Sequence, residues 1–287
     1  MSRVVSSVAA LRSALGGDAP GLVPTMGALH TGHASLIQRA AAEHARTVVS
    51  IFVNPTQFSD PVDFSRYPRG LDRDLEIAAA AGADLIFAPT EDEVYATGFS
   101  TSVEVATLTE RWEGAFRPGH FRGVATVVTI LLSAVQPAAS YFGEKDYQQL
   151  VVIRRLHRDL RLPGKVVGCA TVRDADGLAL SSRNARLTAE QRQHAGVLPR
   201  ALFRIASLVE SGEVEVGSLL TAGQAELDQA PDLSVDYLAI VDPETLESIP
   251  RVESRARVLA AVRLGAVRLI DNVEVLAPGA AGTGRAG

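Results

Sequence analysis

Residues 22–45 read LVPTMGALHTGHASLIQRAAAEHA, and this stretch decides the fold. The apolar run at 22–24 predicts a short buried strand. Residues 32–45 predict a helix, because apolar side chains recur there every three or four positions. A glycine-containing turn joins the two. A strand that leads through such a turn into a helix is the repeating unit of a parallel sheet covered by helices.

The same alternation continues along the first half of the chain. Further strands are predicted at 47–53, 84–88, 140–143 and 165–171, with helices at 72–81, 123–135 and 147–160. The pattern predicts an α/β fold, a Rossmann-like parallel-sheet domain over residues 1–171. In such sheets, ligands bind beyond the carboxyl ends of the strands.

The pattern changes after Asn184. One long helix is predicted at 188–210 and a second at 218–229, followed by short strands at 236–241, 257–262 and 266–270. These elements predict a smaller α+β domain over residues 172–276. Residues 277–287 are mostly Gly and Ala and predict a flexible tail.

Composition excludes several classes of protein. The chain has 287 residues, 47% of them hydrophobic and 21% charged, which rules out a disordered chain or a disulfide-stapled miniprotein. Its net charge of -5 lacks the basic character of a nucleic-acid binder. The single cysteine, Cys169, cannot form an internal disulfide and is predicted to be buried. There is no secretory signal pattern and no run of about 18 apolar residues, so we expect a cytoplasmic protein with no membrane span.

The first candidate site is the turn before the first helix, PTMGALHTGH at 24–33. A helix N-terminus presents unpaired N–H donors that favour phosphate. His30 and His33 are three positions apart, so both imidazoles can face one ligand. With Asp72 or Asp74 they could instead hold a metal ion. The chain has no compact Cys/His framework, which favours a phosphate-bound Mg²⁺.

Two further motifs carry groups that bind phosphate. GEKDYQQ at 143–149 holds Lys145, one of only two lysines among 28 cationic residues. LSSRN at 180–184 offers two hydroxyls and a guanidinium in consecutive positions. Each motif has a structural alternative, a solvated turn for the first and a polar linker for the second.

Two loops are dense in polar and aromatic side chains. Residues 54–69 hold Gln57 and Tyr67 among three prolines, which favours a rigid pocket wall. Residues 111–122 hold Arg117 and His120, and His120 is alternatively a cap for the next helix. The chain has no G-x-G-x-x-G, Walker or G-x-S-x-G motif, and Cys169 is in too apolar a context for a nucleophile. These absences favour nucleotide chemistry without a covalent enzyme intermediate.

Four motifs in order, PTMGALH at 24–30, FVNPTQF at 52–58, GEKDYQQ and LSSRN, together resemble the pantoate-β-alanine ligases within the nucleotidyltransferase superfamily. The resemblance implies that pantoate and MgATP form pantoyl adenylate and pyrophosphate. The free amine of β-alanine then displaces AMP to give pantothenate. It also implies a homodimer that acts on small molecules and binds neither nucleic acid nor membrane.

The resemblance also implies roles for individual residues. Catalysis falls to His33, as proton donor, and to His30, Lys145 and Arg183. Gln57 and Gln149 would bind pantoate, and Gln57 would also contact β-alanine. The metal ligands are not identified. The ATP site would comprise Met26, Gly27, Ala28, Leu29, His30, Thr31, Gly32, His33, Gly143, Glu144, Lys145, Asp146, Val172, Leu180, Ser181, Ser182 and Arg183.

Two other functions remain open from the residues alone. One is a nucleotidyltransferase that acts on a phosphorylated acceptor, and the other is a nucleotide-binding module without catalysis. Formation of pantothenate separates both from the ligase.

Overall fold

The computed structural model describes residues 2–59 and 61–279. The chain divides into two units, Met1–Val172 and Arg173–Gly287, one residue beyond the predicted boundary, and each is described by itself.

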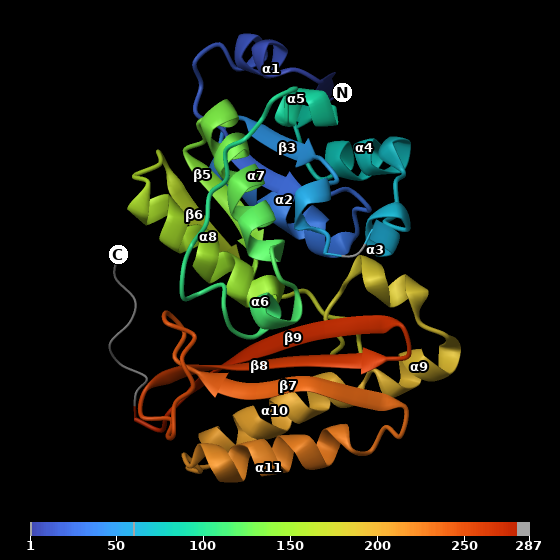
Figure 1. Cartoon of the computed structure of the whole chain (residues 1–287), viewed down its shortest axis with the longest axis vertical. Coiled ribbons are helices and arrows are strands. Elements are labelled where there is room, and N and C mark those ends of the chain that lie inside the picture. The colour runs from blue at the N-terminus through green and yellow to red at the C-terminus, as the bar shows by residue number, and fades with distance from the viewer. Residues whose placement is uncertain (1, 60, 280–287) are drawn as a thin grey trace. The chain divides into compact units, whose positions relative to one another are not determined.

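The first unit is built on a six-stranded sheet in which every described strand pair is parallel (Figure 1). The predicted Rossmann-like fold is therefore confirmed. The strand order is β1-β4-β3-β2-β5-β6, with β1 Arg3–Val5, β2 Gly21–Thr25, β3 Thr47–Ile51, β4 Leu85–Phe87, β5 Ala139–Gly143 and β6 Lys165–Cys169. The strand β1 was not predicted, because three residues at a sheet edge are too few to show a periodic pattern.

Helices cover both faces of this sheet. The main ones are α1 Val8–Leu15, α2 Thr31–Glu43, α4 Leu71–Ala80, α7 His120–Val135 and α8 Tyr147–Asp159. Right-handed crossovers place α2 and α4 on one face, and α1, α7 and α8 together on the other. Val23, Ile37 and Tyr141 lie in the core under α2. Short helices lie at α3 Pro61–Ser65, α5 Glu91–Val94, α6 Glu113–Phe116, η1 Pro55–Gln57 and η2 Glu144–Asp146.

The strands β2 and β5 are the neighbours at which the direction of the crossovers reverses. From β2 the chain passes through α2 toward β3, whereas from β5 it passes through α8 toward β6 on the other side. The helices after these two strands therefore lie on opposite faces, and in open α/β sheets ligands bind at the carboxyl ends of the strands at such a point.

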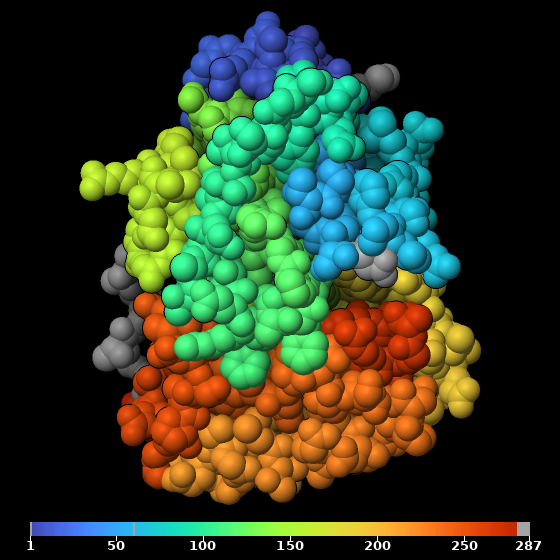
Figure 2. All heavy atoms as spheres, in the orientation of Figure 1, coloured from blue at the N-terminus to red at the C-terminus, as the bar shows by residue number. Residues whose placement is uncertain are grey.

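The segment between α5 and α6 runs beside α7 (Figure 1) and lies on the face of the molecule seen in the space-filling view (Figure 2). The Val103 N–H donates to Thr126 Oγ1 at 3.0 Å, which fixes the segment to α7. The predicted packing helix 123–135 is thus shielded on its outer face as well.

The second unit packs helices against one face of an antiparallel sheet, which confirms the predicted α+β architecture. Val258 and Val262 of the sheet share a core with Leu202 and Ile205 of α10. The elements are η3 Ser182–Arg186, α9 Ala189–His194, α10 Val197–Glu210, α11 Val216–Leu227, β7 Leu233–Val241, β8 Arg255–Leu264 and β9 Val267–Leu276.

Two predictions for this unit are corrected. The single helix expected at 188–210 is broken between α9 and α10, because Pro199 has no N–H with which to continue the helix onto the Ala195 carbonyl. The flexible tail was expected from residue 277, but Ala277 is buried and its N–H donates to the Ser254 carbonyl at 2.9 Å. Residues 280–287 lie outside the described residues.

Candidate active site

The turn between β2 and α2 is held by a buried carboxylate from α4. Asp74, only 3% exposed, accepts the Ala28 N–H at 2.9 Å and the Leu29 N–H at 2.7 Å. Gly27 and Ala28 both have positive φ, 77° and 52°. A Cβ on Gly27 would lie 2.7 Å from Asp74 Oδ2, so glycine is required there for close approach as well as for conformation.

The hydrogen bonds of Asp74 count against its use as a metal ligand together with His30 and His33. Both carboxylate oxygens of Asp74 already accept backbone N–H groups, so they are committed to holding the turn. Within residues 2–59 and 61–279, no cluster of three or more His, Cys, Asp or Glu residues could hold a metal ion.

The two histidines of the first motif cap α2. His30 Nδ1 accepts the Gly32 N–H at 3.1 Å, and His33 Nδ1 accepts the His30 N–H at 3.4 Å. Their ring centroids are 4.2 Å apart. Because each Nδ1 is an acceptor, the proton of each neutral ring lies on Nε2, and each ring presents one N–H donor.

Burial keeps both rings neutral. The pKa of His33 is lowered to about 3, first by burial and then by His30 beside it; Lys145 adds to the shift, and Asp146 opposes it. The pKa of His30 is also lowered, by burial first and then by Lys145. At neutral pH the imidazoles therefore supply N–H donors, and Lys145 and the helix N-terminus supply the positive potential.

Lys145 lies beside these histidines, because β5 is the neighbour of β2 in the sheet. Its ammonium acts electrostatically on both rings, and its Nζ lies 3.5 Å from Asp146 Oδ1. The Lys145 side chain is only 16% exposed. The first and second motifs, far apart in sequence, therefore converge at the carboxyl ends of adjacent strands.

Gln57 follows β3 and is oriented by its neighbours. Its Oε1 accepts from Asn54 Nδ2 at 3.0 Å, and this leaves Nε2, 3.0 Å from Met26 Sδ, directed at the first motif. The Tyr95 hydroxyl donates to Asn54 Oδ1 at 2.7 Å. No role was predicted from the sequence for Asn54 or Tyr95. The position of Asn54 within FVNPTQF was a usable signal, whereas nothing in the sequence marked Tyr95.

The backbone of Gln57 is held from α7. His120 Nδ1 donates to the Gln57 carbonyl at 2.8 Å, and Arg117 donates to the same oxygen at 3.4 Å. His120 is the first residue of α7, with Gly119 at the cap position, so the alternative that His120 caps this helix is wrong. A Cβ on Gly123 would lie 2.4 Å from the Thr56 carbonyl oxygen, which explains why a glycine faces this loop.

The aromatic residues of the 54–69 loop pack on one another. The Phe58 ring contacts Phe64 and Tyr67, with centroids 5.3 and 5.6 Å apart, and the Arg69 guanidinium lies over Phe64. This packing is compatible with the rigid wall predicted from the prolines.

Adjacent glutamines at the start of α8 differ in their surroundings. Gln148 is buried, accepts the Glu113 N–H at 3.0 Å, and donates to the carbonyls of Leu108 and Arg111. Gln148 thus fixes the segment before α6. Gln149 is half-buried, and its predicted contact with pantoate stays a prediction.

The remaining motif belongs to the second unit. Ser181 accepts the Arg183 N–H at 3.2 Å and caps η3, while Asn184 donates to the Ala179 carbonyl at 3.0 Å. Leu180, Ser181, Ser182 and Arg183 are all half-buried. Val172 ends the first unit. The approach of these residues to a nucleotide stays a prediction.

The model of the pantoate-beta-alanine ligase family matches residues 2–274. The chain belongs to the pantoate-beta-alanine ligase family. Among relatives of this ligase, the pantothenate synthetase of Thermus thermophilus is 53% identical over 274 residues, covering 95% of this chain and 99% of the relative. That of Moorella thermoacetica is 51% identical, covering 88% of this chain and 89% of the relative.

Solved structures of the ligase family share the whole fold. The crystal structure of the Thermus thermophilus pantothenate synthetase has a TM-score of 0.93 at 52% identity and covers 96% of this chain and 99% of its own. The ligase of Francisella tularensis, complexed with beta-gamma ATP and beta-alanine, has a TM-score of 0.79 at 33% identity and covers 95% and 97%. The resemblance inferred from the four motifs is confirmed. In the part of the chain that the structure describes, no helix is both long and apolar enough to cross a membrane.

Proposed function

We propose that this chain condenses pantoate with β-alanine in an ATP-dependent reaction that passes through pantoyl adenylate. The convergence of two neutral imidazoles, one ammonium and one oriented amide at the carboxyl ends of β2, β5 and β3 carries the proposal. Membership of the ligase family, and the relative that holds an ATP analogue and β-alanine, support it.

In the first step, the pantoate carboxylate attacks the α-phosphorus of ATP and pyrophosphate leaves. Bringing two anions together requires preorganised donors, each typically worth about 3 kcal/mol at the transition state. The α2 N-terminus, the Nε2–H groups of His30 and His33, and the Lys145 ammonium provide them, with Arg183 proposed as a further donor. The other proposed ATP contacts are those implied by the motifs, from Met26 to His33, from Gly143 to Asp146, and Val172, Leu180, Ser181 and Ser182.

The orientation of Gln57 indicates how it binds the acid substrate. Asn54 occupies its Oε1, so Gln57 offers an N–H donor. A donor suits the carboxylate or hydroxyl oxygens of pantoate, and we propose Gln149 as the second contact. Gln57 would also contact β-alanine once the adenylate has formed.

In the second step, the free amine of β-alanine attacks the acyl carbon, the bond to the phosphate oxygen breaks and AMP leaves. The Nδ1 lone pair of His33 is committed to the His30 N–H, and its Nε2 carries the proton. His33 is therefore suited to donate a hydrogen bond to the departing phosphate and unsuited to deprotonate the amine. Because the lowered pKa of His33 leaves its ring neutral, we propose that it acts as a hydrogen-bond donor; the role of proton donor that the resemblance implies would need a protonated ring.

Mg²⁺ fits this site as an ion carried by the phosphates. Such an ion keeps most of its ligands as phosphate oxygens and water, with one or two carboxylates from the protein. Asp74 is committed to the backbone, whereas Asp146 is 46% exposed beside Lys145 and is the carboxylate that could contribute an oxygen. The ion would neutralise phosphate charge during adenylation.

We also propose that the protein is a cytoplasmic homodimer and that its second unit closes over the adenylate. An acyl adenylate must be kept from water, and closure of a loop or domain is the usual means.

The experiment that tests the activity is product analysis with the purified protein. With ATP, pantoate and β-alanine we expect equal amounts of pantothenate, AMP and pyrophosphate. Without β-alanine we expect one pantoyl adenylate and one pyrophosphate per site. Pyrophosphate exchange that needs a phosphorylated acceptor in place of pantoate would favour the nucleotidyltransferase. Nucleotide binding without turnover would favour the binding module.

A further inference from the structure

The loop that carries Arg183 begins at a small hairpin in the second unit. Arg173 and Ala179 pair across this hairpin as an isolated antiparallel bridge, and Gly177, with a φ of 87°, makes its turn. The residues that follow Ala179 are Leu180, Ser181 and Ser182. The position of the loop at 180–183 therefore depends on where this hairpin is held.

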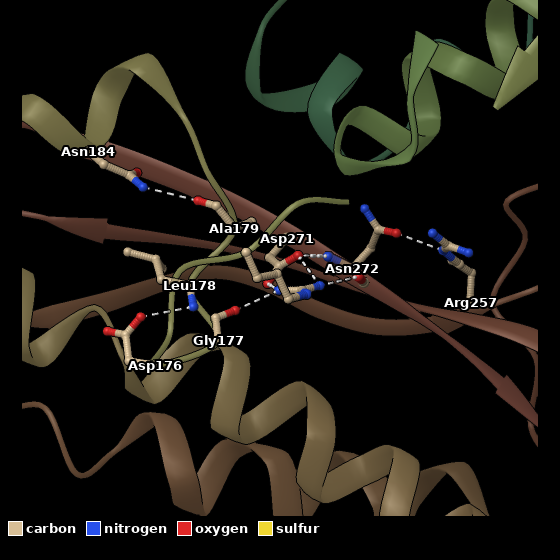
Figure 3. A network of polar contacts seen from close by, with 9 residues as sticks. Asp176, Gly177, Leu178, Ala179, Asn184, Arg257, Asp271 and Asn272 are labelled. Atoms are coloured by element: carbon tan, nitrogen blue, oxygen red, sulfur yellow. Dashed lines mark hydrogen bonds and ion pairs between the residues drawn. The ribbon is translucent and has the colours of Figure 1, made fainter. Parts of the chain in front are cut away.

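Arg173 fixes the hairpin to β9. Its guanidinium donates to both oxygens of Asp271, at 2.6 and 2.9 Å, and to the carbonyls of Gly177 at 2.9 Å and Asn272 at 3.2 Å (Figure 3). It also lies over the Phe203 ring, 5.1 Å from the centroid. One planar side chain thus joins the hairpin turn, the strand β9 and the helix α10.

The partner carboxylate is an unusual occupant of its position. Asp271 pairs in register with Ala260, a core residue on the face of the sheet that packs against the helices, and its side chain has no exposed surface. Two apolar residues of similar size in place of a buried ion pair often leave stability unchanged or improved. Stability alone therefore does not account for an ion pair here.

The far end of the loop returns to the same hairpin. Asn184 Nδ2 donates to the Ala179 carbonyl at 3.0 Å (Figure 3), and the Asn184 N–H donates to the Ser181 carbonyl at 3.0 Å. The anchor on β9 is itself fixed, because the Asn272 N–H donates to Asp271 Oδ1 at 2.7 Å and Arg257 donates to Asn272 Oδ1 at 2.6 Å. A continuous chain of bonds leads from β9 through Arg173 to both ends of the loop.

We propose that Arg173 is a positioning residue for adenylation, which holds the Arg183 loop in the geometry that binds ATP by clamping its hairpin to buried Asp271. This inference rests on the proposed function of the chain. The four hydrogen bonds of the guanidinium have directions that an apolar pair could not reproduce. On this proposal, the Arg173–Asp271 ion pair serves to fix the position of the hairpin.

The test replaces the pair by apolar residues, Arg173→Met with Asp271→Leu. We expect a melting temperature within about 4 °C of the parent protein, because the replacement removes a buried charge together with its partner. We expect the KM for ATP to rise, and single-turnover adenylation to slow, by about tenfold or more, because the loop is displaced.

The matched control is Arg268→Met with Asp236→Leu. This ion pair lies in the same unit, between β9 and β7, with side chains 14% and 10% exposed, and Asp236 also accepts from the more exposed Arg263 at 2.9 Å. We expect parental KM and adenylation rate in the control. A stable Arg173/Asp271 double variant with a parental KM for ATP and a parental adenylation rate would overturn the proposal.

Two further measurements keep the test decisive. If the double variant does not fold, Arg173→Lys takes its place, since it keeps the charge and loses the paired geometry; a parental KM for ATP in folded Arg173→Lys also overturns the proposal. The parent protein is assayed first for pantothenate. Its failure there would count against the proposed function, whereas a normal parent with unaffected variants would count against Arg173 alone.

Discussion

The two segments proposed to contact the nucleotide are held in different ways. The turn at 24–33 is fixed by Asp74, which binds backbone N–H groups, and by two histidines that fold back onto their own helix. The loop at 180–183 is fixed through Arg173, whose carboxylate partner lies 98 positions further along the chain. The first segment largely carries its own geometry, whereas the second obtains its geometry from a distant strand.

The largest expected effect is on the rate of adenylate formation, when the positive charge of Lys145 beside the turn at 24–33 is removed. Lys145→Ala should slow adenylate formation by roughly two orders of magnitude, as loss of a contact worth about 3 kcal/mol predicts. Single-turnover formation of pantoyl adenylate measures it. The control is Lys165→Ala, at the other lysine, which is exposed on β6 and should leave the rate unchanged. Arg183→Ala should match Lys145→Ala if both segments serve one nucleotide, and a parental rate in Arg183→Ala would break that comparison.

Replacing one acceptor oxygen of the Asp74 carboxylate, which holds the turn at 24–33, should lower the free energy of unfolding. Asp74→Asn leaves one buried backbone N–H without an acceptor, which predicts a loss of about 1–3 kcal/mol in the free energy of unfolding. Urea unfolding measures the loss. Asp72→Asn, at an exposed position in the first turn of the same helix, should change little. Equal stability of the two variants would show that the turn holds its shape without Asp74.

Acid should weaken the first segment through His33. Its folded pKa of about 3 lies below the unfolded value of 6.5, so the unfolded state binds the proton more readily, and stability falls as the pH drops from 6.5 toward 3. Between pH 7 and pH 5 the loss should be on the order of 1–2 kcal/mol. Urea unfolding at the two pH values measures it. His33→Gln should reduce this loss, and His157→Gln on α8 should retain it; identical pH dependence in both variants would contradict the assignment.

The smallest effect should appear at the exposed side of the second segment's hairpin. Arg192 pairs with Asp174 and Asp176 there, and all three side chains are partly exposed to solvent. Arg192→Ala should therefore lower the free energy of unfolding by less than about 1 kcal/mol and leave the KM for ATP unchanged. A rise in the KM for ATP as large as that of the Arg173/Asp271 variant would show that the exposed Arg192 pairs position the hairpin as much as the buried Arg173–Asp271 pair does. The buried pair would then have no special role.

Much of the fold could be predicted from local patterns. Strand and helix periodicity located five of the six parallel strands and four of the five main helices that cover them, all but α1, because these strands are buried and these helices have an apolar face. The prediction failed where the deciding contact is not periodic. A three-residue edge strand carries no pattern, and the break between α9 and α10 depends on a single missing N–H at Pro199.

The candidate site, like the fold, was predictable only in part. His30, His33, Lys145 and Gln57 were predicted from residue type and motif, and the parallel sheet brings three of the motifs together. The charge state of the imidazoles was not predictable, because it depends on burial beside Lys145. Nor was the orientation of the Gln57 amide, which depends on Asn54 and, through it, on Tyr95.

By itself, the sequence determined the order of strands and helices, the family and the residue types available for phosphate chemistry, since these follow from local periodicity and from short contiguous motifs. Only the tertiary structure decided which tautomer each histidine adopts, which atom of Gln57 faces the first motif, and that a carboxylate on β9 holds the hairpin before Arg183. The physical reason is that hydrogen bonds and burial depend on neighbours brought together by folding, and a linear pattern does not contain those neighbours.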